Sequence, residues 1–183
     1  MLPAPKATGH MSQQSSASAG LRLFAALLGV AHAHGNEYSW AAWVGGSRSA
    51  NQNGVYGSSG VASASNMPGG REGATSWVDT SSRRVYVFGG SGRDSGSASD
   101  GALNCLWAWD MDAAAGEGWI WIGGSNSANQ NGVYGSMGVV SASNMPGSRY
   151  NAASWVDTSL RRAYVFGGKG YDESPDSIGQ LNW

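Results

Sequence analysis

The sequence predicts an all-β protein made of repeated antiparallel sheets. Three observations lead to this fold class. The 183 residues include 29 Gly and 9 Trp, a composition that favours strands and turns over long helices. Short apolar or alternating segments are separated by turn residues, as in hairpins. Most of the chain is also a tandem repeat, which is typical of folds that stack one small unit many times.

Residues 1 to 36 differ from the rest and are interpreted as a leader. They contain Lys6 and Arg22, no acidic residue, and an apolar run at residues 23 to 30. That run is far shorter than the roughly 20 residues of a membrane-spanning helix, so no membrane span is expected. Its length fits a signal peptide, and Ala31-His32-Ala33 supplies a small-x-small cleavage pattern. We therefore expect secretion. The alternatives are an organellar transit peptide and a cytoplasmic chain with a disordered tail.

The body of the chain, residues 37 to 183, carries two copies of one unit offset by 78 residues. Residues 43 to 105 match residues 121 to 183 at 44 of 63 positions without a gap. The strings SANQNGVYGS, SASNMPG, SWVDTS and YVFGG all recur at this offset. The two copies are therefore expected to share one local structure. Because copies this similar agree by descent, their agreement does not by itself mark functional residues.

Four antiparallel strands are expected between residues 71 and 122. The turn TSSRR separates the first two, and Trp107 and Trp109 stand two apart on one face of the third. The strands are expected at residues 74 to 79, 85 to 88, 103 to 111 and 119 to 122. A four-stranded sheet that is apolar on both faces must stack on neighbours, as a blade of a β-propeller does.

The chain holds an incomplete set of such blades. Residues 40 to 44 are expected as a lone outer strand, residues 71 to 122 as a whole blade, and residues 149 to 183 as the first half of another. About two four-stranded blades cannot close, because propellers need at least four. The chain is then either a fragment of a longer gene or one member of a ring, in which the N-terminal strand of one copy completes the last blade of the next. Open blade faces also predict self-association.

The strand endings Phe88-Gly89-Gly90 and Phe166-Gly167-Gly168, with LNCLWAWD and GWIWIGG after the first of them, resemble the kelch repeat. Together with NQNGVYG and NMPG, residues 40 to 183 resemble the long-blade kelch proteins related to the propeller of galactose oxidase. The resemblance implies a partial kelch-type β-propeller. It also implies a protein-interaction role at least as often as an enzymatic one.

Several kinds of chemistry are excluded by composition and motif. A net charge of −1 with 13% charged residues argues against nucleic acid as a partner. The single cysteine, Cys105, cannot form an internal disulfide. His10, His32 and His34 all lie in or beside the leader, so the blades supply no histidine for a copper site like that of galactose oxidase. The nucleophile elbow G-x-S-x-G is missing. We expect no catalytic residue, no metal and no cofactor.

The remaining chemistry-bearing residues have simpler structural interpretations. Strand tryptophans favour packing between blades over stacking on sugars; they are Trp77, Trp107, Trp121 and Trp155. Cys105 is expected as a small buried apolar residue. Arginine pairs in turns are expected as solvated charges; they are Arg83-Arg84 and Arg161-Arg162. A solvated loop is favoured over a cation site for the acidic residues Asp172, Glu173 and Asp176.

The long loops are the candidate binding surface. In an up-and-down blade the short turns at residues 79 to 84 and 112 to 118 emerge on one side. The long loops emerge on the other, at residues 46 to 70, 91 to 102, 124 to 148 and 169 to 180. Binding residues concentrate on loops that a rigid scaffold holds. The candidates have the tyrosine and amide character of recognition loops: Asn51, Gln52, Asn53, Tyr56, Asn129, Gln130, Asn131 and Tyr134. The alternative is that Asn and Gly satisfy loop backbone and allow positive φ.

These observations predict a binding or scaffold module for a protein or glycan ligand, and not an enzyme. Two alternatives stay open. The chain is a portion of a larger propeller enzyme whose catalytic residues lie in absent blades, or it is a truncated copy without function.

Overall fold

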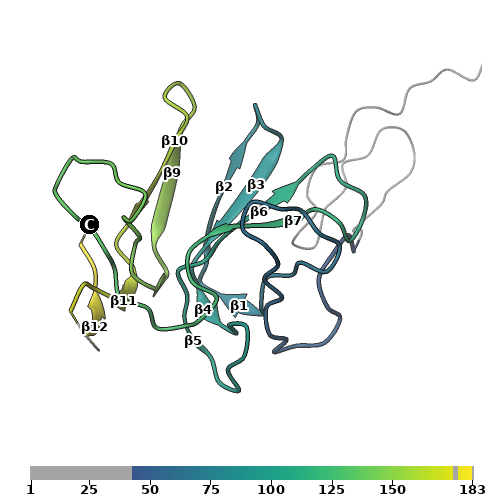
Figure 1. Ribbon diagram of the computed structural model, residues 1–183, viewed down its shortest axis with the longest axis horizontal. Helices are drawn as coiled ribbons and strands as arrows, with labels where there is room; N and C mark the ends of the chain where they lie inside the picture. Colours follow the sequence, from purple (N-terminus) through teal and green to yellow (C-terminus); the bar gives the residue numbers. More distant parts are fainter. Residues whose placement is uncertain (1–42, 175–176, 183) are drawn as a thin grey trace, which may run out of the picture.

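The computed structural model describes residues 43 to 174 and 177 to 182. The leader, the first three residues of the expected strand at 40 to 44, Asp176 and Trp183 lie outside the described residues. Within the described residues every regular element is a β-strand, and all strand pairs are antiparallel (Figure 1). The all-β prediction is therefore confirmed. No helix in the described part of the chain combines the length and apolarity needed to cross a membrane.

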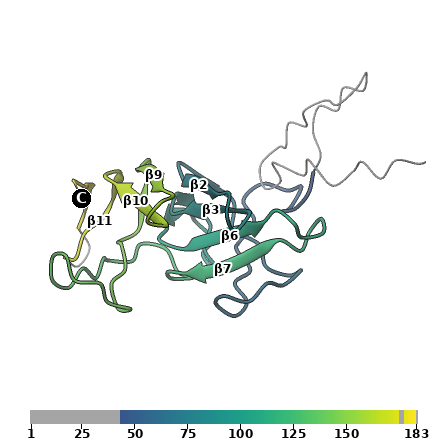
Figure 2. The ribbon, with the colours of Figure 1, turned by 90° about the horizontal axis from the view of Figure 1, so that it is seen from above.

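The first copy forms a four-stranded sheet, called here blade 1. Its strands are β2 (Thr75–Asp79), β3 (Arg84–Phe88), β6 (Leu106–Asp110) and β7 (Trp119–Gly123), in the spatial order β2-β3-β6-β7. Each strand pairs antiparallel with the next, so the sheet is an up-and-down meander (Figure 2). The four strands expected from the sequence are all present, within a few residues of the expected bounds.

Among the described residues, the second copy forms the first half of such a sheet, called here blade 2. Its strands β9 (Ala153–Asp157) and β10 (Arg162–Phe166) form a hairpin in the register of β2 and β3. In blade 1 the outer edge of β3 is paired with β6. Among the described residues, no strand pairs with the corresponding edge of β10. The expectation of an incomplete second blade agrees with this arrangement.

Two small sheets within and beside the expected loops were not predicted. One contains β1 (Arg71–Glu72), β4 (Ser91–Gly92) and β5 (Gly101–Ala102), and the other contains β8 (Arg149–Tyr150), β11 (Lys169–Tyr171) and β12 (Ile178–Gln180). Segments of two or three residues are too short to show an alternating pattern. The glycines in them instead permit close backbone approach, since a Cβ on Gly92 or Gly170 would overlap the carbonyl oxygen of Gly70 or Ser148.

The expectation of an outer strand at residues 40 to 44 is wrong for the residues that the structure describes. Trp43 and Val44 belong to no strand. The carbonyl oxygen of Val44 accepts a hydrogen bond from the N–H of Gly116, and the Val44 side chain packs against the core of blade 1. Trp43 is 61% exposed, with the guanidinium carbon of Arg48 4.6 Å from its ring centroid. Val44 therefore covers part of its own blade, because the tryptophan face of that blade offers apolar contact.

The core lies on one face of blade 1 and is built from aromatic side chains. Trp107 and Trp109 are 0% and 2% exposed and pack edge to face against Trp119. Cys105 is fully buried among them, as expected for a small apolar residue. Trp121 and Trp77 are half-buried. Trp155 is 52% exposed, so it is not the core residue that the sequence suggested.

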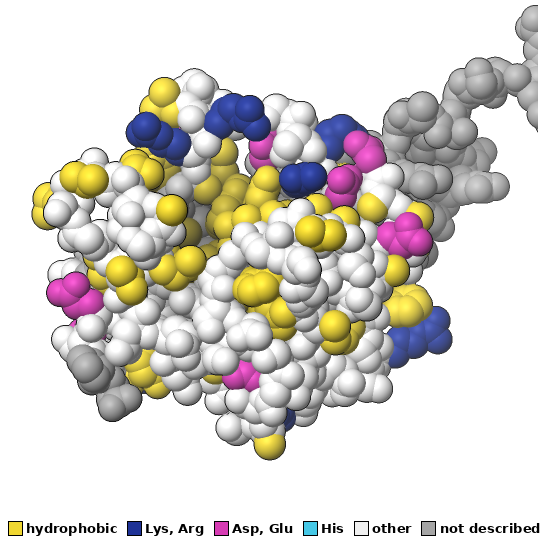
Figure 3. Space-filling view, viewed as in Figure 1, with side chains coloured by type: hydrophobic (Ala, Val, Ile, Leu, Met, Phe, Trp, Pro, Cys, Tyr) yellow, Lys and Arg dark blue, Asp and Glu magenta, His cyan; other side chains and the backbone are white. Residues whose placement is uncertain are grey.

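The two blades lie side by side through their first strands, β2 and β9 (Figure 1). The hydroxyl of Thr75 donates to the hydroxyl oxygen of Ser154 at 2.5 Å, and Ser154 donates to the carbonyl oxygen of Ser76 at 3.2 Å. Apolar side chains gather in the hollow between the blades (Figure 3). The hairpin turns of both blades lie at the end of the molecule opposite to the two small sheets (Figure 1).

Candidate functional site

The long loops of the two copies meet at one end of the blades, as the up-and-down topology predicted. Asp94 and its repeat equivalent Asp172 hold them together. The Asp94 carbonyl accepts from the N–H of Gly54, and its carboxylate accepts from the N–H of Ala128 at 2.9 Å. The Asp172 carbonyl accepts from the N–H of Gly132. Through these hydrogen bonds, the loops at residues 46 to 70, 91 to 102 and 124 to 148 form one surface.

The polar loop candidates are mostly used to build this surface. Asn51 and Asn129 have left-handed backbones, with φ of 56° and 61°, which Asn tolerates better than most residues. The side-chain oxygen of Asn129 accepts from the N–H of Ala102. Gln52 and Gln130 donate their side-chain amides to carbonyls two residues earlier. These four residues therefore serve the loop backbone, through the left-handed φ of Asn51, the bond of Asn129 to a neighbouring loop and the turns that Gln52 and Gln130 close, which is the structural alternative that the sequence left open.

Asn53 and Asn131 differ from those four. Asn53 is exposed and Asn131 half-buried, and neither side chain has a hydrogen-bond partner among the described residues. The amides of Asn53 and Asn131 make no structural hydrogen bond in that part of the chain, which is also true of the Asn51 side chain.

Tyr56 is a core residue, and this corrects its place on the expected recognition surface. It is 8% exposed and packs against Trp107 and Trp121, with ring centroids 4.9 and 5.4 Å apart. Its hydroxyl donates to the sulfur of Cys105, which also accepts from the guanidinium of Arg71, both at 3.3 Å. Burial, with the nearby thiol, raises the pKa of Tyr56.

Tyr134, the repeat equivalent of Tyr56, lies instead at the edge of an open groove. Its hydroxyl oxygen accepts from the N–H of Gly147 and from the guanidinium of Arg149, which is 2% exposed. Burial lowers the pKa of Arg149. The groove has a volume of about 870 Å³, and its floor combines apolar and acidic groups, among them Met137, Val139, Val140, Asp172 and Glu173.

The groove lies at the loop that a strand covers in the first copy, and no described strand lies over it in the second. In blade 1, β7 lies along residues 59 to 66. The N–H of Gly60 donates to the Trp121 carbonyl at 2.7 Å, and the Asn66 amide donates to the Trp119 carbonyl at 3.1 Å. The equivalent Asn144 donates only to Val139 among the described residues, and its buried side-chain oxygen has no partner there.

The exposed apolar residues of this groove were missed from the sequence. Met137 is 102% exposed and Val140 95% exposed. A signal was present, because Met137 and Val140 stand where the first copy has Ser59 and Ala62, within an otherwise identical stretch. The serine at the first position donates to a β7 carbonyl, a bond that methionine cannot make.

A second candidate surface is the free edge and outer face of blade 2. Trp155 and Tyr164 stack at 5.6 Å with an interplanar angle of 10°, as Trp77 and Tyr86 do in blade 1. Trp155 and Phe166 are 52% and 50% exposed, and Tyr164 is 37% exposed. Three aromatic side chains on one hairpin therefore face solvent, a concentration that marks a contact surface.

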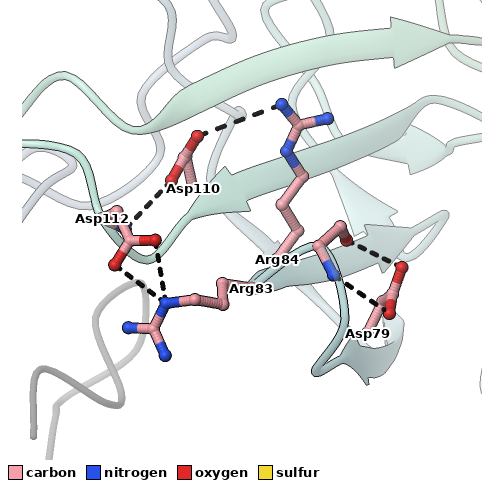
Figure 4. Close-up of polar contacts among 6 residues, drawn as sticks. Asp79, Arg83, Arg84, Asp110 and Asp112 are labelled. Atoms are coloured by element: carbon pink, nitrogen blue, oxygen red, sulfur yellow. Dashed lines mark hydrogen bonds and ion pairs between the residues drawn. The ribbon is translucent and has the colours of Figure 1, made fainter. Parts of the chain in front are cut away.

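The turn arginines of blade 1 are ion-paired, as Figure 4 shows. The Nε of Arg83 lies 2.8 Å from the carboxylate of Asp112, and Arg84 lies 4.0 Å from Asp110. Hydrogen bonding with Asp112 raises the pKa of Arg83. Arg161 and Arg162, the equivalents in blade 2, are exposed. Exposed pairs contribute little to stability, so these arginines set the charge of the turn surface.

No protein-family model, no curated protein and no solved structure matches this chain. The site must therefore be interpreted from its own geometry. Among the described residues, no group of three or more His, Cys, Asp or Glu side chains is placed to hold a metal ion.

Asp94 offers a test of how the loop surface is held together. Burial alone would raise its pKa, but hydrogen bonds from the N–H groups of Gly96, Ala128 and Ser97 and from the Ser97 hydroxyl lower it to about 2. We expect Asp94→Ala to reduce the free energy of unfolding by about 1–3 kcal/mol, because buried N–H donors lose a charged acceptor. Urea unfolding measures this.

The acid dependence of stability checks the same carboxylate. Because the pKa of Asp94 is lower in the folded state, its contribution is complete above about pH 4 and is lost as the pH falls through about 2. Asp94→Ala should remove this component of the pH dependence. Asp172→Ala is the matched control, since the Asp172 carboxylate accepts only from Ser174 and Ser177 among the described residues. Equal losses in the two variants would contradict the role given to Asp94.

Proposed function

We propose that this chain is a kelch-like β-propeller portion that acts as a protein-binding scaffold and receives a β-strand of its partner at the free edge of β10. The observation that carries the proposal is the contrast between two nearly identical hairpins. The edge of β3 is paired with β6 along five residues, whereas no described residue pairs with the same edge of β10. Addition of a strand to an exposed sheet edge is a recurrent mode of protein recognition.

A protein ligand is favoured over a glycan because most of the loop residues expected to bind a ligand have structural roles instead. The amides of Gln52 and Gln130 close their own turns, Asn129 bonds the N–H of Ala102 in a neighbouring loop, and Tyr56 is buried. The aromatic groups that remain exposed lie beside a free strand edge, where backbone N–H and C=O groups offer a ladder of hydrogen bonds.

The repeat also specifies the chemistry of the incoming strand. In blade 1, Phe88 is opposite Leu106, Tyr86 is opposite Ala108, and Arg84 is opposite Asp110. Residues Phe166, Tyr164 and Arg162 hold these positions in blade 2. The edge is therefore suited to a strand of the pattern Leu-x-Ala-x-Asp, antiparallel to β10, with apolar groups toward Phe166 and an acidic group toward Arg162.

A synthetic peptide with the sequence of residues 106 to 123 is the probe for this proposal. It carries both strands that complete blade 1, β6 and β7, with their own turn. We expect the full chain to bind it saturably, whereas a peptide of scrambled order should not bind. Titration followed by isothermal calorimetry measures the affinity. Equal binding of the two peptides, or no binding, would overturn the proposal.

Charge exchange tests the register of the bound strand. Arg162→Asp, at an exposed residue, should weaken binding of the native peptide several-fold, because like charges then face each other across the strands. A peptide carrying Asp110→Lys should bind this variant better than it binds the unaltered chain. Arg161→Asp is the matched control, since Arg161 precedes the strand. If the exchanged pair gave no recovery, the proposed register would be wrong.

A further inference from the structure

We propose that copies of this chain associate head to tail, with the outer face of blade 2 in one copy packed on the free face of the β2–β3 hairpin in the next. The contact between blades within the chain supplies the template for this inference. This association rests on the scaffold role proposed above and gives that role a partner, namely a second copy of the chain. The contact uses the faces of the blades and not the edge of β10.

Within the chain, the two blades meet through opposite faces of equivalent hairpins. Side chains alternate along a strand, so Trp77 and Tyr86 lie on one face of blade 1, and Val78 and Val85 lie on the other. A cleft of about 240 Å³ between the blades is lined by Trp77, Tyr86 and Leu106 on one side. Val156, Ala163 and the turn residues Thr158, Arg161 and Arg162 line the other side. The aromatic face of blade 1 therefore meets the aliphatic face of blade 2.

Each of these faces occurs once more on the described part of the molecule and is exposed there at several residues. The aromatic face of blade 2 carries Trp155 and Tyr164, which are 52% and 37% exposed. The aliphatic face of blade 1 is also the face that carries the core, and Val87 is only 8% exposed there. It is open at Val78, which is 37% exposed, and at Ser76, which is also exposed. A groove of about 420 Å³ runs beside Ser76, Val87 and Trp119 on that face.

Most residues that make the internal contact have like equivalents in the two open faces, although Ala153 stands in place of Thr75 and Leu106 has no equivalent among the described residues. Trp77, Asp79 and Tyr86 correspond to Trp155, Asp157 and Tyr164. On the opposite face only Ala163 differs, because Val85 replaces it. The remaining equivalent pairs there are Ser154 and Ser76, Val156 and Val78, Thr158 and Thr80, Arg161 and Arg83, and Arg162 and Arg84. A second copy therefore presents a surface similar to the one that the chain already binds in itself.

One hydrogen bond of the internal contact is also available between copies. Ser154 donates its hydroxyl to the carbonyl oxygen of Ser76. At the proposed interface, Ser76 of the next copy is the equivalent donor toward the carbonyl of Ser154. Such a contact joins two different surfaces, so it generates a closed ring or an open chain of copies, and not a symmetric dimer.

Face-blocking variants test the proposal with the full chain. Trp155→Arg blocks the aromatic face of blade 2, and Ser76→Arg blocks the aliphatic face of blade 1. Sedimentation velocity should show assemblies larger than a dimer for the unaltered chain at high concentration. Each variant alone should remain monomeric. An equimolar mixture should form a one-to-one dimer and nothing larger, because each variant retains the face that the other lacks.

Controls separate this outcome from misfolding and from other modes of association. Both variants should keep the circular dichroism spectrum and urea midpoint of the unaltered chain. If Trp155→Arg does not keep them, Trp155→Ser is used in its place. Val140→Arg, at a 95% exposed residue outside both faces, should assemble like the unaltered chain. The proposal would be overturned if the unaltered chain were monomeric or if the mixture of the two variants stayed monomeric. It would also be overturned if assembly ended at a dimer that Ser76→Arg did not affect. Binding of the 106 to 123 peptide reports on the β10 edge alone, so failure of either proposal is recognised separately.

Discussion

Trp107→Ala is expected to remove most of the stability of the chain. Trp107 is 0% exposed and packs against Tyr56 and Trp119 in the centre of blade 1. Truncation of a buried aromatic residue to alanine leaves a cavity and costs about 3–5 kcal/mol. A natural domain has only about 5–15 kcal/mol in total. Urea unfolding followed by tryptophan fluorescence and circular dichroism measures the loss.

Trp155→Ala is the matched control for this prediction. Trp155 also belongs to a β-strand but is 52% exposed, so its truncation should change the free energy of unfolding by less than about 1 kcal/mol. Trp107→Phe should cost less than Trp107→Ala, because it retains a ring and removes an indole N–H that has no partner among the described residues. A loss in Trp155→Ala as large as that in Trp107→Ala would contradict the position of the core.

Gly89→Ala is expected to destabilise the chain more than Gly167→Ala, although the two glycines occupy the same position in the repeat. Both have left-handed backbones, with φ of 66° and 72°, so each substitution carries a conformational cost of about 1–2 kcal/mol. A Cβ on Gly89 would also lie 2.5 Å from the carbonyl oxygen of Arg149, which accepts the N–H of Gly90. That overlap adds about 1–3 kcal/mol.

The comparison of these two variants isolates the contact of Gly89 with the carbonyl oxygen of Arg149 in β8. The nearest atom to a Cβ on Gly167 is the carbonyl oxygen of Leu181, at an acceptable 3.4 Å, so only the backbone cost should appear. Urea midpoints of the two variants, measured side by side, give the difference directly. Equal costs would mean that the junction of Gly89 with Arg149 does not contribute to the fold.

The strands of blade 1 could be predicted because their signals are local. Alternation in TSWVD and in LWAWD, with turn residues between them, identifies half-buried strands without any knowledge of their neighbours. A positive φ at Asn51 and Asn129 could also be anticipated, since it is a conformational property of a single residue. The two-residue strands β1, β4 and β5 were not predictable, because their pairing depends on glycines that meet distant backbone.

The candidate site was predicted only in part. The long loops do meet, and Tyr134 does border a groove. The sequence placed Tyr56 beside it, however, and missed Met137 and Val140. Nothing in NQNGVYGS, which is the same string in both copies, distinguishes the buried tyrosine from the one at the groove. The distinction comes from β6 and β7, which cover Tyr56 and have no counterpart over Tyr134 among the described residues.

The sequence alone determined the all-β class, the period of 78 residues and the meander of blade 1, since periodicity and turn chemistry act over a few neighbouring residues. The tertiary structure decided which member of each repeated pair is buried: Tyr56 and not Tyr134, Trp77 more than Trp155, Asn66 and not Asn144. The physical reason is that burial is a property of the surroundings. Identical residues have different solvent exposure when a strand or a blade lies against one copy and not against the other.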